Sequence, residues 1–182
     1  MIKYIIIGVI LLIVLYLILV INTFIKYRNK VKEAFSTMDV CLKKRFDLIP
    51  SLVETVKGYA KHESTTLEEV IKLRNTPYDK QDINEKVDLN ESVSKNVTKL
   101  MILAESYPEL KANENFHKLS DELIEIENEL SKSRRYYNGC VRQYNNKVEV
   151  FPNNIFATLF GFKSYKMFEI ETSEKENINI EL

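Results

Sequence analysis

Glycine, proline and tryptophan are scarce in this sequence. Its 182 residues include four Gly, four Pro and no Trp. Tight turns between strands rely on Gly and Pro, so this scarcity disfavours a β-rich fold. Charged residues make up 29% of the chain, a share that suits long helices with one face in water. We therefore expect an all-α protein with a single domain outside any membrane segment.

The chain also lacks an excess of charge of one sign. Lys and Arg together number 26, and so do Asp and Glu. Proteins that bind nucleic acid normally present a surplus of Lys and Arg to the phosphates. We therefore expect no nucleic-acid partner.

Cysteine is as rare as histidine, with two of each in the chain. Cys41 and Cys140 lie far apart, show no metal-ligand spacing and fall within apolar helical patterns. Buried reduced thiols are common at such positions, and we expect both cysteines to be unpaired core residues.

Motifs of familiar enzymes are missing. His62 and Glu63 lack the second histidine of a zinc-protease helix, because Thr66 stands in its place. Glu114 and His117 form one Glu-x-x-His pair, whereas a di-iron bundle needs two. Phosphate-binding loops and nucleophile elbows are also absent from the sequence. We expect no catalytic residue, no metal ligand and no cofactor.

One long uncharged run is present near the start. Residues 4–25 contain no charged side chain, and about 22 residues in a helix cover about 33 Å, enough to cross a bilayer. A cleaved signal sequence is the alternative, but the run is too long for one and no small-residue pair marks a cut near Asn22. We expect a retained transmembrane helix.

Basic residues are distributed unequally around this run. Lys3 precedes it, whereas four basic residues follow at once: Lys26, Arg28, Lys30 and Lys32. Cytoplasmic flanks carry the larger share of Lys and Arg. We expect residues 1–3 to lie outside the cell and the C-terminal domain to lie in the cytoplasm at the cell membrane.

Apolar residues spaced three and four apart predict four helices after the span. The first should continue past Pro50 with a kink and end near Lys61. The second should begin at a capping box formed by Thr65 and Glu68 and stop before Pro77. The polar residues 78–90 predict a surface linker, with a partly helical stretch as the alternative.

The third and fourth helices follow this linker. The third runs from Val93 to Ala104, and the fourth is capped by Asn113 and stopped by Pro152. Each predicted helix carries one stripe of apolar residues along its length. Together the four apolar stripes predict an elongated antiparallel four-helix bundle with a long kinked first helix, packed in the manner of a coiled coil. Whether these helices pair within one chain or between chains, as a homo-oligomer, stays open.

The last part of the chain divides into three pieces. Residues 155–162 are strongly apolar and could cover the end of the bundle, contact lipid at the membrane interface or bind a partner. Apolar and polar side chains alternate over residues 165–170, which predicts a short extended piece. The domains are then residues 1–3, the span 4–25, a helical domain over 26–168 and an acidic tail over 169–182.

Four long strings carry a family resemblance: KKRFDLIPSLVETVKGYAKHESTTLEEV from Lys43, SYPELKANENFHKLSDEL from Ser106, SRRYYNGCVRQYN from Ser133 and VFPNNIFATLFGF from Val150. The chain resembles the LemA family in them. The resemblance implies a single-pass bacterial membrane protein with a cytoplasmic helical bundle and no established reaction. It also implies an association of some members with magnetosome membranes and a neighbouring membrane metalloprotease as a candidate partner.

Three functional hypotheses follow. The preferred one is a non-enzymatic scaffold or adaptor anchored in the membrane, with an unidentified protein partner. The second is a membrane-remodelling or envelope-stress protein that assembles on the lipid bilayer, and the third is a metal-dependent enzyme. The residues predicted to form an interaction surface are Asp47, His62, Glu63, Asn113, Arg134, Arg135, Tyr136, Asn138, Phe156 and Phe160.

Overall fold

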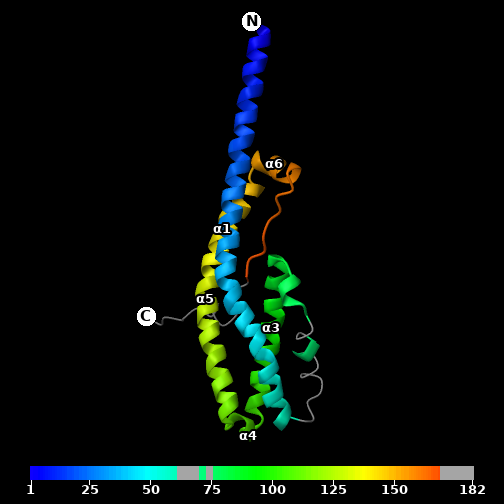
Figure 1. Cartoon of the computed structure of the whole chain (residues 1–182), viewed down its shortest axis with the longest axis vertical. Coiled ribbons are helices and arrows are strands. Elements are labelled where there is room, and N and C mark those ends of the chain that lie inside the picture. Colours follow the sequence, from blue (N-terminus) through cyan, green and yellow to red (C-terminus); the bar gives the residue numbers. More distant parts are fainter. Residues whose placement is uncertain (61–69, 73–75, 169–182) are drawn as a thin grey trace, which may run out of the picture.

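The chain folds almost entirely into helices (Figure 1). The structure is a computed structural model that describes residues 1–60, 70–72 and 76–168. No strand occurs among these residues, so the all-α prediction is confirmed for them. The elements in chain order are α1 (Ile2–Tyr59), the 3-10 turn η1 (Tyr78–Lys80), α3 (Ile83–Glu105), α4 (Pro108–Lys111), α5 (Glu114–Glu149) and α6 (Asn153–Leu159).

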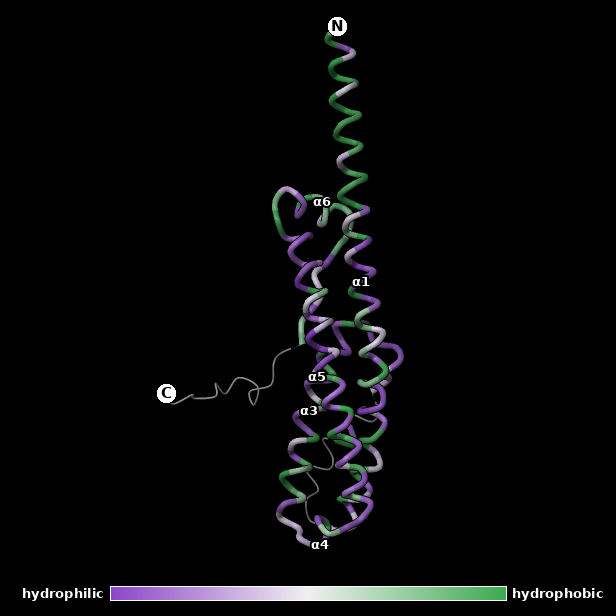
Figure 2. The backbone as a smooth tube through the Cα atoms, turned by 90° about the vertical axis from the view of Figure 1, so that its left-hand side faces the viewer, coloured by the Kyte–Doolittle hydropathy of each residue, from purple (hydrophilic) through white to green (hydrophobic). Residues whose placement is uncertain are grey.

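Helix α1 joins the predicted span and the first bundle helix without a break. Its large apolar side chains are exposed from Ile2 to Leu19 with few exceptions, and burial begins at Val20 and Phe24. Figure 2 shows this free part as a continuous hydrophobic end that projects beyond the other helices. Within the described part of the chain, α1 is the one helix long and apolar enough to cross a membrane.

Helices α1 and α5 form the main contact of the bundle and run antiparallel. At the lower end in Figure 1, Asn113 Nδ2 donates a hydrogen bond of 2.9 Å to Tyr59 Oη. Toward the other end, the rings of Phe35 and Tyr137 lie 5.7 Å apart. The shared core is built from the apolar stripes that the sequence predicted, including Val31, Met38, Leu42, Ile49 and Val56 of α1 and Leu123, Ile126, Leu130, Cys140, Tyr144 and Val148 of α5; Val141 adds to it.

Helix α3 packs beside α1 and runs in the same direction. Lys86 near its start meets Asp39, and Ser94 one layer further along meets Arg45. Three long helices therefore make up the described bundle. Most of the second predicted helix lies outside the described residues. Within its described part, Val70 to Lys72 are helical and Val70 is buried. The four-helix count stays a prediction.

Residues 78–90 are partly helical, as the alternative prediction had it, but the prediction that they form a surface linker is wrong. Helix α3 begins at Ile83 rather than at Val93, and Tyr78 and Val87 are buried. A capping box starts the helix: Glu85 N donates to Asp82 Oδ1 over 2.9 Å, and Asp82 N donates to Glu85 Oε2 over 2.8 Å. The first four backbone N–H groups of a helix have no partner within the helix, and the box provides acceptors for two such groups. It thereby stabilises the start of α3 within a stretch of polar composition.

Pro50 and Pro152 act as predicted, one inside a helix and one after a helix end. Helix α1 continues through Pro50 to Tyr59, and its axis changes direction in its lower half (Figure 1). Helix α5 ends at Glu149, ahead of Pro152. Its start is also confirmed, because Asn113 Oδ1 accepts a hydrogen bond of 3.0 Å from Phe116 N.

Candidate interaction surfaces

An extended segment, residues 163–168, follows α6 and lies against α5; we call it the strap. Two asparagines of α5 hold its backbone. Asn145 Nδ2 donates to Tyr165 O over 2.9 Å, and Asn145 Oδ1 accepts from Tyr165 N over 3.0 Å. Asn138 makes the same pair of bonds with Phe168, at 2.9 Å each. Each side-chain amide thus satisfies both backbone groups of one strap residue, as a neighbouring strand would.

The spacing of the two asparagines matches the strap. Asn138 and Asn145 are seven residues apart in a helix, which corresponds to about 10.5 Å. Tyr165 and Phe168 are three residues apart in an extended chain, which corresponds to about 10 Å. The two clamps can therefore close together without strain in the strap.

The strap also ties α5 to α3. Tyr137 Oη of α5 donates to Lys166 O over 3.0 Å, while Asn84 Oδ1 of α3 accepts from Lys166 N over 2.9 Å. The buried ring of Phe168 packs edge-on against Tyr137 at 5.4 Å. Burial raises the pKa of the Tyr137 phenol well above its ordinary value, so this hydroxyl stays a hydrogen-bond donor at physiological pH.

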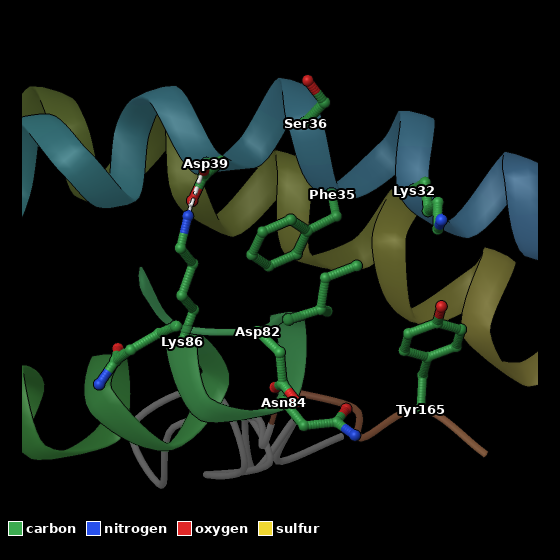
Figure 3. Close-up of a pocket in the computed structure, with 10 residues that line it drawn as sticks. Lys32, Phe35, Ser36, Asp39, Asp82, Asn84, Lys86 and Tyr165 are labelled. Atoms are coloured by element: carbon green, nitrogen blue, oxygen red, sulfur yellow. Dashed lines mark hydrogen bonds and ion pairs between the residues drawn. The ribbon is translucent and has the colours of Figure 1, made fainter. Parts of the chain in front are cut away.

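A cleft of about 490 Å³ opens between α1, the start of α3 and the strap (Figure 3). Lys86 reaches across it to Asp39, whereas Lys32 and Tyr165 lie at its opposite side and Ser36 points away. The Lys86 and Asp39 charges are paired at 2.9 Å, and Asp82 caps α3. The charges in the cleft thus serve the contact between the two helices, and we assign no ligand to it.

Asp39 binds a second group from η1. Tyr78 Oη donates to Asp39 Oδ1 over 2.6 Å, and Lys86 Nζ lies 4.4 Å from the centre of the Tyr78 ring. Burial, reinforced by the Asp39 carboxylate, raises the pKa of Tyr78 well above its ordinary value. These contacts fasten η1 and α3 to α1.

A buried charge crosses the middle of the bundle. Arg45 of α1 is 5% exposed; its Nη1 donates to Asn90 Oδ1 over 3.1 Å and to Ser94 Oγ over 2.9 Å on α3. Its Nη2 lies 3.2 Å from Glu127 Oε2 on α5, and Arg134 pairs with the other Glu127 oxygen at 3.0 Å. One side chain of α1 therefore links all three long helices, which fixes their relative register.

Helix α6 lies across α1 where the free hydrophobic part of that helix ends (Figures 1 and 2). Phe156 packs edge-on against Tyr16 at 6.1 Å, and Phe162 lies 5.0 Å from Phe24. The other face of the segment is exposed, with Ile155 at 57% and Leu159 at 72%. It thus covers α1 on one side and presents apolar side chains on the other.

Three of the residues predicted to form an interaction surface have contacts within the fold. Asn113 caps α5 and bonds Tyr59, Arg134 pairs with Glu127, and Asn138 clamps the strap. Polar residues within an amphipathic helix are hard to divide into binding and structural groups from spacing alone, because both kinds border the apolar stripe.

The other predicted residues are scattered. Arg135 and Tyr136 are exposed on α5, and Asp47 is exposed on α1, where it pairs with Lys43 at 2.7 Å. Phe160 is 48% exposed at the end of α6 and Phe156 is half-buried against Tyr16. His62 and Glu63 lie outside the described residues. The described members of the set therefore form no single patch.

Sequence reasoning missed Arg45, Asn84 and Asn145. A charged Arg45 inside an otherwise apolar stripe was the available signal, since a charge at such a position needs partners. The asparagines offered a weaker one: the spacing of Asn138 and Asn145 places them on one helix face, but nothing in the sequence says that an extended segment returns to that face.

Neither cysteine is in a disulfide. Both thiols are buried, and Cys41 Sγ lies 3.5 Å from Glu129 Oε2. Burial, reinforced by the Glu129 carboxylate, raises the pKa of Cys41 above its ordinary value, which lowers its reactivity as a nucleophile. Within residues 1–60, 70–72 and 76–168, no group of three or more His, Cys, Asp or Glu side chains is arranged to hold a metal ion.

Comparison with known proteins adds a family to this architecture. Protein LemA of Metamycoplasma hominis is 25% identical over 164 residues, which cover 88% of this chain and 73% of that protein. Magnetosome proteins MamQ 1 and MamQ 2 of Paramagnetospirillum magneticum are each 28% identical over 71 residues, 39% of this chain but 26% of theirs. The model of the LemA family matches residues 34–182, so this chain belongs to the LemA family.

Proposed function

We propose that the protein is a non-enzymatic scaffold anchored in the cell membrane by α1, with its bundle in the cytoplasm. One observation carries the proposal: the exposed apolar part of α1 continues without a break into the helix that organises the bundle. A helix of 58 residues covers about 87 Å, and its internal proline, Pro50, lies within the bundle rather than at the junction with the apolar span. An enzyme domain would not require such a rigid connection, whereas a scaffold that presents a surface at a fixed distance from the bilayer would.

The cytoplasmic orientation rests on the basic residues that follow the span, Lys26, Arg28, Lys30 and Lys32, against Lys3 alone before it.

The exposed residues Arg135 and Tyr136 on α5 are the surface that we propose for a protein partner. Arg and Tyr are enriched where interfaces gain most of their binding energy. A membrane metalloprotease is the first partner to test, and a second copy of the chain is the next.

Photocrosslinking in intact cells tests this surface. A photoreactive amino acid at Tyr136 should give one reproducible adduct with a defined membrane protein, and the matched exposed position Ile102 on α3 should not. Arg135→Glu should abolish the adduct without changing the amount of protein in the membrane. The scaffold proposal fails if Tyr136 gives no adduct under conditions that capture a known complex of similar abundance.

A second function, membrane remodelling, is supported by the stretch of 71 residues shared with two proteins named as magnetosome proteins and by the exposed apolar side chains of α6. The full-length protein reconstituted at rising density into large vesicles would then deform them into tubules or smaller vesicles. Vesicles that stay spherical at a density where the protein self-associates would exclude this function.

A further inference from the structure

The segment around α6 has no charged residue. From Val150 to Phe162 the chain carries thirteen uncharged residues between Glu149 and Lys163, although charged residues make up 29% of the whole chain. Its exposed apolar side chains are Val150, Phe151, Ile155, Leu159 and Phe160. Contiguous exposed apolar surface of this kind marks a binding face rather than a water-facing one.

The inner and outer faces of α6 are distinct. Phe156 packs against Tyr16 of α1, and the adjacent Ala157 is buried, at 3% exposed. Ile155 and Leu159 are four residues apart in α6, so they lie along the same side of the helix, and Phe151 is exposed just before the helix begins. The exposed side chains of α6 therefore form a face separate from the one that packs into the core. It is an apolar ridge with nothing from the described residues covering it.

The position of α6 on α1 identifies what covers this ridge. The segment touches α1 at Tyr16 and Phe24, and Tyr16 Oη donates to Asn153 Oδ1 over 3.4 Å. Both α1 residues belong to the uncharged run that ends before Lys26. The exposed apolar surface of α6 thus continues the exposed apolar surface of the span itself.

Helix geometry places α6 inside the bilayer if α1 crosses it. If α6 stayed in water, the water boundary would lie at Tyr16, and the uncharged residues left between Lys3 and Tyr16 would cover about 18 Å. A hydrocarbon core is about 30 Å thick. The uncharged run covers about 30 Å only when residues up to about Thr23 lie in the membrane, and the part of α6 that contacts Tyr16 then lies in the membrane with them.

Charges mark the water boundary at the same level. Lys26 and Lys30 are exposed on α1, and Lys163 is exposed directly after the apolar segment. Arg28 lies 5.2 Å from the centre of the Phe162 ring, where its charge can reach the headgroups while its stem covers the ring. Phe24 is two residues and Tyr16 ten residues before Lys26, about 3 and 15 Å along the helix. This range includes the depth of helices that lie in the membrane interface.

We propose that α6 is an interfacial helix: its outer face, formed by Ile155 and Leu159, lies with the preceding Phe151 in the acyl region of the same leaflet that α1 enters from the bundle, and the basic residues around it contact anionic headgroups. The partner of this surface is phospholipid, not protein. The inference rests on the proposed function only in taking α1 as a membrane anchor. It gives the molecule a second point of attachment, which holds the bundle at one tilt and one rotation about α1.

The absence of tryptophan allows a direct test. Full-length variants with a single tryptophan would be reconstituted into vesicles of phosphatidylcholine and phosphatidylglycerol, with either ordinary or bromine-labelled acyl chains that quench tryptophan at contact distance. The probes are Leu159→Trp and Ile155→Trp on the outer face of α6. Leu11→Trp in the exposed part of α1 is the lipid control, and Tyr136→Trp, which replaces an exposed aromatic of α5, is the water control.

The proposal predicts that bromine-labelled lipid quenches the α6 probes strongly, close to the loss at position 11, while emission at position 136 is unchanged. Removing phosphatidylglycerol should reduce the quenching at position 159 more than at position 11. If position 11 is quenched and positions 155 and 159 behave like position 136, the α6 proposal is wrong but the anchor stands. If a second copy of the chain covers the outer face of α6, the quenching results would be the same, and position 159 would in addition give crosslinks between the two copies. Absence of quenching at position 11 overturns both proposals.

Discussion

At the scale of single residues, Arg45 shows how a charge can organise a bundle. It is almost fully buried, yet Asn90, Ser94 and Glu127 surround its guanidinium. The adjacent Lys44 is exposed on the same helix. A substitution at one position breaks a network across three helices, whereas a substitution at the next affects only a solvated side chain.

Replacing Arg45 with Met should therefore destabilise the bundle by about 2 kcal/mol, somewhat less than for a fully enclosed pair, because Glu127 is one-third exposed and keeps Arg134. Lys44→Met should change the free energy of unfolding by less than about 0.5 kcal/mol. Urea denaturation of both variants, followed by circular dichroism in detergent micelles, measures the difference. Equal stabilities would show that the buried charge adds nothing to the bundle.

The titration of Tyr78 makes the stability of the bundle depend on pH in the alkaline range. Its pKa is raised in the folded state by burial and by Asp39, so the folded protein holds the phenolic proton after the unfolded chain has lost it. The contribution to stability is complete below the unfolded pKa of about 10 and falls as the pH rises above it.

Tyr78→Phe removes this titration along with the bond to Asp39. The variant should be less stable than the wild type at pH 8 by about 1 to 2 kcal/mol, the cost of a lost hydrogen bond to a charged group. The difference should shrink as the pH rises from 10 to 11. Unfolding curves at these three pH values test the prediction, and a difference that is independent of pH would contradict it.

At the scale of elements, the strap depends on side-chain amides rather than on apolar burial alone. Asn138 and Asn145 make four hydrogen bonds with the backbone of Tyr165 and Phe168. Asn146 lies next to one of them on the same helix but is exposed, and so provides a matched control.

Asn138→Ala and Asn145→Ala should each release part of the strap, at a cost of about 1 to 2 kcal/mol for two lost bonds. Hydrogen exchange at the amides of Tyr165 and Phe168 should speed up about tenfold or more in these variants. Asn146→Ala should leave both amides protected. Unchanged exchange in the Asn138 variant would mean that Phe168 burial holds the strap without the clamps.

The elements also show where sequence reasoning succeeds. The stripes of α1, α3 and α5 and the Asn113 cap could be predicted because a buried helix face repeats every three or four residues and a cap is a local interaction. The start of α3 was missed because polar side chains between Asp82 and Asn90 form contacts across the bundle, whereas a polar composition is typical of a solvent-exposed linker. The pairing of the strap with Asn138 and Asn145 is a contact between segments far apart in sequence, for which the sequence holds no periodic signal.

At the scale of the whole molecule, two features define the shape: one continuous helix from the apolar end to the far end of the bundle, and α6 beside that helix where the bundle begins (Figure 1). The candidate surfaces follow from this arrangement. The exposed face of α5 stands away from the apolar end, where a protein can reach it, while α6 is held at the level of the span.

Protease protection tests the central claim, a bundle anchored by α1 and facing the cytoplasm. The full-length chain would carry an epitope at its C-terminus, and protease would be added to intact cells freed of any wall and to inside-out membrane vesicles from the same cells. The epitope should survive in the intact cells and be lost from the inside-out vesicles, with all of the protein in the membrane fraction after alkaline extraction. Digestion in the intact cells, or release of the protein by alkali, would contradict it.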